Sequence, residues 1–194
     1  MDRDLRSPVL LGNHDKAAST DLPLVNLRDI AVAGIEFSRA KLSAEERAFL
    51  KSLPLTARNH GCQFVHASLI EPSEWDYVTS GLEADVHFGC QDAPICFSGH
   101  THVPMVWQKS AEKMTTVRKG VGKIDLRPGF QYLINVGAVG QPRDLSPNAC
   151  YVIYNEGKPS VEFRRVQYDI AKTGRKISRA KLPKFLAQRL SLGR

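Results

Sequence analysis

The chain has 194 residues, of which 42% are hydrophobic and 24% are charged, close to the averages of globular proteins. This length suits one ordinary domain, and the composition excludes a disordered, fibrous or low-complexity protein. The longest apolar run, Ile30 to Ile35, is too short to cross a bilayer, so we expect no membrane association. Acidic residues at Asp2 and Asp4 stand where a secretory leader would be basic, which predicts a cytoplasmic protein.

The net charge of +7 is concentrated near the C-terminus. From Arg164 to Arg194 there are ten basic residues and one acidic residue, and the part before it is close to neutral. Such a segment attracts nucleic acid or acidic partners. We favour a solvated helix face over a nucleic-acid surface, because aromatic residues do not alternate with the charges as single-strand binding requires.

The first half of the chain alternates short apolar runs with helical patterns. Pro8–Leu11 is predicted as a strand that runs into a loop. Residues 26–42 are predicted to be mostly helical, with core contacts from Ile30, Ile35 and Phe37. Ser43 and Glu46 form a capping box, which predicts a short helix that ends before Pro54.

Strands dominate the second half, separated by Gly, Pro and Asn turns. Two strands, 62–65 and 95–97, are predicted in the first half. The later predicted strands are 103–108, 115–118, 132–136, 150–155 and 161–167. The tail from 170 to 192 is predicted as one or two helices, broken near Pro183. This order of elements favours a layered α/β protein.

The four cysteines contain no closely spaced pair, and without a secretory leader we expect them to be reduced. Cys90 and Cys96 precede His100 and His102, but zinc knuckles and ribbons use tighter pairs, so a cysteine-containing zinc site is not favoured. Cys62 and Cys96 lie in apolar runs and are predicted core residues.

Histidines fall at or just after the ends of short apolar runs: His14, His66, His100 and His102. Because the carboxyl ends of strands are where sites assemble in α/β sheets, these imidazoles are predicted to meet, together with the Asn13 amide. Imidazole with amide or carboxylate oxygen suits Mn, Fe, Ni, Zn or Co rather than Ca or Cu(I).

For each of these residues a structural role competes with a functional one. Asn13 would serve equally as a turn or capping residue. His60 lies in a plain polar turn and His87 lacks any strand-end context, so both are assigned structural roles. For His100 and His102 the functional role is favoured, because alternate residues of an extended segment face the same way.

The sequence resembles a known family at these positions. Gly12-Asn13-His14-Asp15, Val65-His66 and Gly99-His100-Thr101-His102-Val103-Pro104 look like the third, fourth and fifth motifs of the calcineurin-like metallophosphoesterases, in the family's order. The segment from Asn135 to Asp144 and the ending from Leu182 to Leu190 are similar to bacterial members. The likeness covers the chain from Pro8 onward.

The resemblance implies an α/β fold: an αββα sandwich of two mixed β-sheets flanked by helices, with a dinuclear metal centre. It implies that Asn13, His66 and His100 ligate one metal and His102 the other, the ions being Mn, Fe, Zn or Ni. His14 would contact the phosphate and act as general acid. The implied activity is hydrolysis of phosphomonoester or phosphodiester bonds, with a phosphate ester as substrate and no particular oligomeric state.

Two motifs of the family, Asp-x-His and Gly-Asp-x-x-Asp, have no match in this sequence. The expectation is therefore a single domain over residues 1–194 that is incomplete at its N-terminus, with 169–194 a basic helical segment. Asp15 and Asp92 are candidates for a replacement carboxylate by sequence proximity alone. The alternative is a catalytically inactive remnant that binds a metal or an acidic partner.

Overall fold

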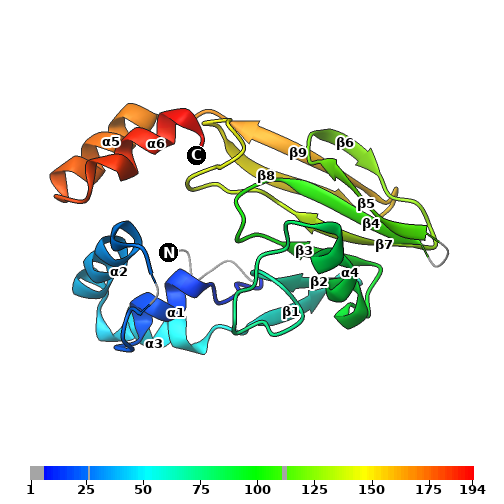
Figure 1. Ribbon diagram of the computed structural model, residues 1–194, viewed down its shortest axis with the longest axis horizontal. Coiled ribbons are helices and arrows are strands. Elements are labelled where there is room, and N and C mark those ends of the chain that lie inside the picture. Colours follow the sequence, from blue (N-terminus) through cyan, green and yellow to red (C-terminus); the bar gives the residue numbers. More distant parts are fainter. Residues whose placement is uncertain (1–6, 26, 111–112) are drawn as a thin grey trace.

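The computed structural model describes residues 7–25, 27–110 and 113–194 (Figure 1). The helices are α1 (Asn13–Ser19), α2 (Asp29–Lys41), α3 (Ala44–Ser52), α4 (Gly81–Cys90), α5 (Ile170–Arg179) and α6 (Lys184–Leu192). The strands are β1 (Thr56–Asn59), β2 (Cys62–Val65), β3 (Ile95–Ser98), β4 (Met105–Ser110), β5 (Lys113–Lys119), β6 (Gly122–Asp125), β7 (Phe130–Asn135), β8 (Ala149–Asn155) and β9 (Ser160–Val166).

These strands form two sheets that lie face to face (Figure 1). The larger is a mixed six-stranded sheet in the order β1-β2-β3-β7-β4-β5, in which β2 and β7 run parallel to β3. The smaller has three strands in the order β6-β9-β8, and its pairs are antiparallel. With helices flanking the sheets, the predicted sandwich architecture is confirmed, although the described pairs of the smaller sheet are not mixed.

The main core lies between the two sheets. Phe97 and Ile134 of the larger sheet pack with Val161 and Phe163 of the smaller one, all of them buried. Gly120, in the link between β5 and β6, lies against the Phe163 ring of β9, which leaves no room for a Cβ there. Apolar side chains from both inner faces therefore hold the sandwich together, as burial of such surface generally does.

Helix α4 covers the other face of the larger sheet. Ala84 and Phe88 of the helix pack with Val65, Cys96 and Leu133 of three neighbouring strands. The Ser80 hydroxyl and the Glu83 carboxylate cap the start of the helix reciprocally. This second core fixes the strands whose carboxyl ends carry the histidines discussed below.

The N-terminal helices sit beyond one end of the sheets, on the same side of the molecule as α5 and α6 (Figure 1). Helix α1 packs against α2 and α3. Arg39 of α2 donates to the carbonyls of Ala17 and Leu22, and Arg47 of α3 donates to that of Ser19. These bonds satisfy carbonyls at the C-terminal end of α1 and fix the direction of the helix.

Most of the expected elements are present. The capping box at Ser43, the strands from 62 and from 95, the later strands and the tail helices interrupted near Pro183 are confirmed. Ile35 is buried as expected, whereas Phe37 is exposed. None of the helices formed by the described residues is long and apolar enough to cross a membrane.

The predicted strand at Pro8–Leu11 is wrong. The N–H of Leu11 donates to the carbonyl of Pro54, and helix α1 begins two residues later. No sheet of the described residues includes this segment as a strand. An apolar run becomes a strand only where a neighbouring strand completes its hydrogen bonds, and residues 7–12 have none there.

Candidate metal centre

Two parallel strands bring His66 and His100 to the same edge of the larger sheet. His66 follows the last residue of β2, and His100 follows β3 after a single glycine. The N–H of Gly99 donates to the carbonyl of His66 at 2.9 Å, which ties the two turns together. Because neighbouring parallel strands end at the same edge of a sheet, the two imidazoles lie close together.

Three donor atoms converge at this edge. His66 Nε2 lies 3.1 Å from Asn13 Oδ1 and 3.2 Å from His100 Nδ1. A neutral imidazole nitrogen either donates or accepts, so the two contacts of His66 Nε2 compete with each other. A cation at this point would instead accept a lone pair from all three donors.

Asn13 is placed by the start of helix α1. The N–H of Gly12 donates to Asp15 Oδ2 at 3.0 Å, which caps the helix and holds the Asp15 carboxylate beside the cluster. A Cβ on Gly12 would lie 3.0 Å from His66 Cε1 and 3.1 Å from Asp15 Oδ2. Only glycine fits between these two side chains without displacing one of them.

A different loop holds His102. Its Nδ1 lies 2.8 Å from the carbonyl oxygen of Gln141, in the loop after β7. His100 and His102 have φ values of 63° and 61°. The argument that an extended segment faces both imidazoles the same way is therefore wrong, because both residues have left-handed backbone. Such strain is typical of functional turns.

His14 lies at the exposed start of α1, next to Asn13. Partial burial of the imidazole lowers its pKa, the positive charge of Arg143 lowers it further, and Asp15 raises it. The structure thus places His14 within the electrostatic reach of the same loop that holds His102.

The pKa values of the other imidazoles of the cluster are also lowered, which favours their neutral form. Burial lowers the pKa of His66, with a smaller opposing effect from Asp15. Burial, followed by the charges of the neighbouring histidines, lowers the pKa of His100 to about 4. Burial also lowers the pKa of His102, against the effect of its hydrogen bond to Gln141. Neutral imidazole is the form that ligates metals.

Arg143 is a site residue to which the sequence argument assigned no role. Its Nη2 donates to Gln141 Oε1, and its Nε is buried without a hydrogen-bond partner among the described residues. Its backbone N–H donates to the carbonyl of His102. Its charge contributes to the lowered pKa values of His14, His100 and His102 after the larger effect of burial. A fixed guanidinium beside neutral histidines attracts an anion.

Two aromatic residues were also missed. The Tyr77 ring stacks on the His100 ring with centroids 4.2 Å apart, and the Trp75 ring meets that of His66 edge-on at 5.7 Å. Both residues belong to the loop between β2 and α4. Their position a few residues after the strand-end histidine His66 was the available signal. The sequence alone does not show that their rings contact the histidines, so this segment resembled an ordinary loop.

The residues assigned structural roles lie elsewhere. His60 and Gly61 form the turn between β1 and β2, with φ values of 48° and 69°. His87 is fully buried in α4 and accepts from the N–H of Leu69. Asp92 pairs with Arg58 at the start of β3, at the opposite end of that strand from His100, so it cannot replace a missing carboxylate there.

The cysteines do not gather around the histidines. Cys62, Cys96 and Cys150 are buried, and Cys90 is exposed at the end of α4. Cys62 and Cys96 belong to the two core clusters, as the sequence predicts. The four described cysteines are unbridged.

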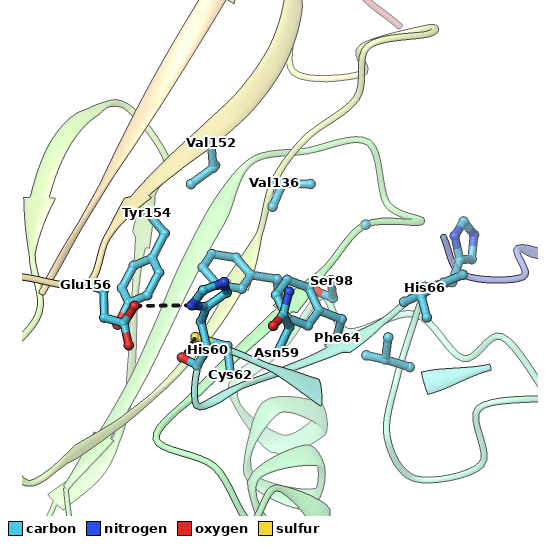
Figure 2. Close-up of a pocket in the computed structure, with 14 residues that line it drawn as sticks. Asn59, His60, Cys62, Phe64, His66, Ser98, Val136, Val152, Tyr154 and Glu156 are labelled. Atoms are coloured by element: carbon cyan, nitrogen blue, oxygen red, sulfur yellow. Dashed lines mark hydrogen bonds and ion pairs between the residues drawn. The ribbon is translucent and has the colours of Figure 1, made fainter. Parts of the chain in front are cut away.

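A cavity of about 530 Å³ leads away from the histidines between the two sheets (Figure 2). His66 lies at one end, and at the other end His60 Nδ1 lies 3.3 Å from the Glu156 carboxylate. Phe64 and Val152 are among the apolar side chains that line it between these ends. The cluster therefore lies at the mouth of a largely apolar space.

The donor atoms of Asn13, His66 and His100 supply part of the ligands that a divalent cation needs. Within residues 7–25, 27–110 and 113–194, no group of three or more His, Cys, Asp or Glu side chains is arranged to hold a metal. The convergent donors are two imidazole nitrogens and one amide oxygen, which together suit a borderline divalent ion with open positions for water or substrate.

Known proteins resemble the chain over nearly its whole length. An uncharacterized protein of Methanocaldococcus jannaschii is 36% identical over 196 residues, which cover 99% of this chain and 78% of that protein. A hypothetical protein of Pyrococcus horikoshii is 17% identical and shares the fold with a TM-score of 0.75. The match covers 96% of this chain and 73% of that one. No family model matches the sequence.

A further solved structure carries a description of function. The crystal structure of a metallophosphoesterase from Sphaerobacter thermophilus matches with a TM-score of 0.81 and 34% identity, over 95% of this chain and 76% of that one. Identity at this level over this coverage establishes common ancestry as well as a common fold. The chain therefore belongs to the calcineurin-like metallophosphoesterase family.

Proposed function

We propose that this domain is a metal-dependent phosphoesterase that hydrolyses phosphomonoester or phosphodiester bonds. The observation that carries the proposal is the convergence of three donor atoms, in which His66 Nε2 lies 3.1 Å from Asn13 Oδ1 and 3.2 Å from His100 Nδ1. Family membership supports the class of reaction. We also propose that residues 1–194 act as one domain, with 169–194 as its basic helical segment.

Asn13, His66 and His100 would hold one divalent ion, and His102 would contribute to a second through Nε2. The ligand types favour Mn, Fe, Zn or Ni. When bound, such ions polarise phosphoryl oxygens and lower the pKa of water, which makes a nucleophile available at neutral pH.

Arg143 would bind the phosphoryl group of the substrate. Its Nε is buried and unpartnered among the described residues, and an oxyanion beside it would satisfy this donor. The hydrogen bonds of its backbone to His102 and of its side chain to Gln141 fix it before any ligand arrives. A preorganised donor costs no rearrangement at the moment of reaction.

His14 would donate a proton to the leaving oxygen. Burial and Arg143 lower its pKa in the free protein, which disfavours the acid form at neutral pH. A bound phosphate anion would neutralise Arg143 and raise the pKa of His14 again. Proton donation by His14 would therefore become effective once a substrate is bound.

The test is hydrolysis of bis-p-nitrophenyl phosphate with Mn²⁺, together with the metal content of each variant. His14→Ala should lower turnover by about 100-fold or more and leave the bound Mn²⁺ unchanged. His60→Ala, which changes an exposed histidine of the β1–β2 turn, is the matched control and should change neither.

Two other outcomes are informative. Mn²⁺ binding without any metal-dependent turnover would favour the alternative, a non-catalytic module that binds a metal or an acidic partner. A chain that binds no Mn²⁺ would contradict both the proposed function and this alternative metal-binding role.

A further inference from the structure

The loop between β2 and α4, residues 66–80, places two aromatic side chains over the histidines. The rings of Tyr77 and His100 are stacked with centroids 4.2 Å apart and an interplanar angle of 28°. The rings of Trp75 and His66 lie 5.7 Å apart at 76°. Trp75 and Tyr77, which we call the aromatic wall, therefore border the donor atoms of the candidate metal centre.

The fold fastens this loop near both ends. At its start, the N–H of Leu69 donates to Nδ1 of the buried His87. At its end, the Glu83 carboxylate of α4 accepts from the N–H groups of Thr79 and Ser80. The aromatic wall is thus positioned by helix α4 and not by contact with a ligand. A preformed surface of this kind binds with little loss of conformational entropy.

The aromatic wall is not explained by core packing. Tyr77 is 51% exposed, so much of its ring remains open beyond the contact with His100. Trp75 has a φ of 61°, in the left-handed region that bulky residues rarely adopt. Backbone strain at a large side chain persists where the surrounding structure fixes it, and it clusters at ligand sites.

The charges of the loop restrict what the aromatic wall can accept. Residues 66–80 contain Glu71, Glu74 and Asp76, all exposed, and no lysine or arginine. Like charges placed opposite one another disfavour binding, so a further phosphate or carboxylate is disfavoured there. An uncharged planar ring, in contrast, stacks on an open aromatic face.

We propose that Trp75 and Tyr77 form the leaving-group subsite of this domain and that it accepts an uncharged aromatic group, as in aryl phosphate esters. This inference rests on the proposed function. In the reaction, a water oxygen forms a bond to phosphorus and releases a proton to solvent, and the bond from phosphorus to the aryl oxygen breaks. The aryl oxygen takes a proton from His14, which solvent then reprotonates. The aromatic wall holds the ring of the departing alcohol.

The experiment compares two phosphonates that cannot be hydrolysed and differ mainly in planarity. Phenylphosphonate, cyclohexylphosphonate and inorganic phosphate are titrated calorimetrically into the Mn²⁺-loaded chain. The variants are Tyr77→Leu, Tyr77→Phe and, as a matched control, Tyr151→Leu, which changes another exposed tyrosine on the outer face of β8. Mn²⁺ affinity is measured for each.

The chain, Tyr77→Phe and Tyr151→Leu should bind phenylphosphonate more tightly than cyclohexylphosphonate. Tyr77→Leu should weaken phenylphosphonate roughly tenfold, as loss of an aromatic stack generally does, while Mn²⁺ and inorganic phosphate bind as before. Equal binding of the two phosphonates by the unchanged chain would overturn the inference. So would a Tyr77→Leu variant that loses Mn²⁺ and phosphate to the same degree, since Tyr77 would then only position His100.

Failure of the proposed function gives a different result. In that case Mn²⁺ and inorganic phosphate do not bind, and the aromatic wall is tested in the metal-free protein by saturation-transfer NMR with phenol and cyclohexanol. A phenol signal that exceeds that of cyclohexanol and falls in Tyr77→Leu supports the aromatic wall. No preference for phenol overturns it.

Discussion

The imidazole of His102 is fastened to the backbone of Gln141, with its Nδ1 2.8 Å from the Gln141 carbonyl oxygen. A carbonyl oxygen only accepts, so Nδ1 carries the proton and Nε2 keeps its lone pair. The N–H of Arg143 donates in turn to the carbonyl of His102. Hydrogen bonding by the second nitrogen is the usual way in which proteins orient a metal-ligating histidine.

Gly12→Ala should weaken Mn²⁺ binding by about tenfold or more, as changes beside a ligand commonly do. The added Cβ would lie 3.0 Å from His66 Cε1 and force this imidazole to move. Gly34→Ala is the control, because nothing lies within 4 Å of a Cβ there. It should stabilise α2 by about 0.5–1 kcal/mol without affecting Mn²⁺. Normal Mn²⁺ affinity of Gly12→Ala, measured calorimetrically, would contradict the placement of His66.

The local part of this site was predictable and the tertiary part was not. His66 and His100 stand just after two apolar strands, so their convergence could be inferred from strand ends alone. Asn13 follows an apolar run that is not a strand, and it reaches the site at the start of α1. Arg143 lies far along the chain and reaches the site only because β7 pairs parallel to β3. No local pattern encodes that neighbourhood. His102 was predicted to lie beside His100 from an extended geometry that the backbone does not have.

The same distinction applies to the fold. The capping box of α3 and the apolar strands from residue 62 onward carry local signals, and these elements were predicted correctly. Helix α4 was missed because its exposed Leu82 and Val86 obscure the apolar face formed by Ala84 and Phe88. Strand β1 is short and mostly exposed, and its pairing with β2 is what makes it a strand.

His87 should make the protein sensitive to acid. Burial lowers the pKa of its imidazole from the ordinary value of 6.5 to about 4. Below pH 6.5 the unfolded chain takes up a proton that the folded protein does not, so the free energy of unfolding should fall from pH 6.5 down to about 4. His87→Gln should flatten this part of the profile, measured by urea unfolding at several pH values. An unchanged slope in the variant would contradict the assignment.

The exposed edge of β8 should promote association. In the sheet order of the described residues β8 is an edge strand, and Tyr151 and Ile153 are 41% and 45% exposed. We expect the chain to bind a hydrophobic dye and to aggregate on concentration. Ile153→Lys should reduce both, whereas Val166→Lys on the central strand β9 should not. A monomer that stays soluble and unfolds in one sharp thermal transition would argue against this expectation.

Turnover by the 194-residue chain should be slow. The Asp15 carboxylate lies beside the convergent donors, and its Oδ2 already accepts from the N–H of Gly12. The carboxylates and the histidine of the family's Asp-x-His and Gly-Asp-x-x-Asp motifs have no match in this sequence. Each missing electrostatic contact to a transition state typically costs roughly 10²- to 10³-fold in rate. Assayed side by side with bis-p-nitrophenyl phosphate and Mn²⁺, the chain should be slower than the Sphaerobacter thermophilus metallophosphoesterase. Equal rates would mean that a carboxylate of this chain supplies the missing contacts.

Anomalous scattering from a crystal of the chain grown with Mn²⁺ locates the ion directly. The account predicts a peak within coordination distance of Asn13 Oδ1, His66 Nε2 and His100 Nδ1, which is lost in His66→Ala and kept in His60→Ala. A peak at any other place, or the same peak in His66→Ala, would contradict it.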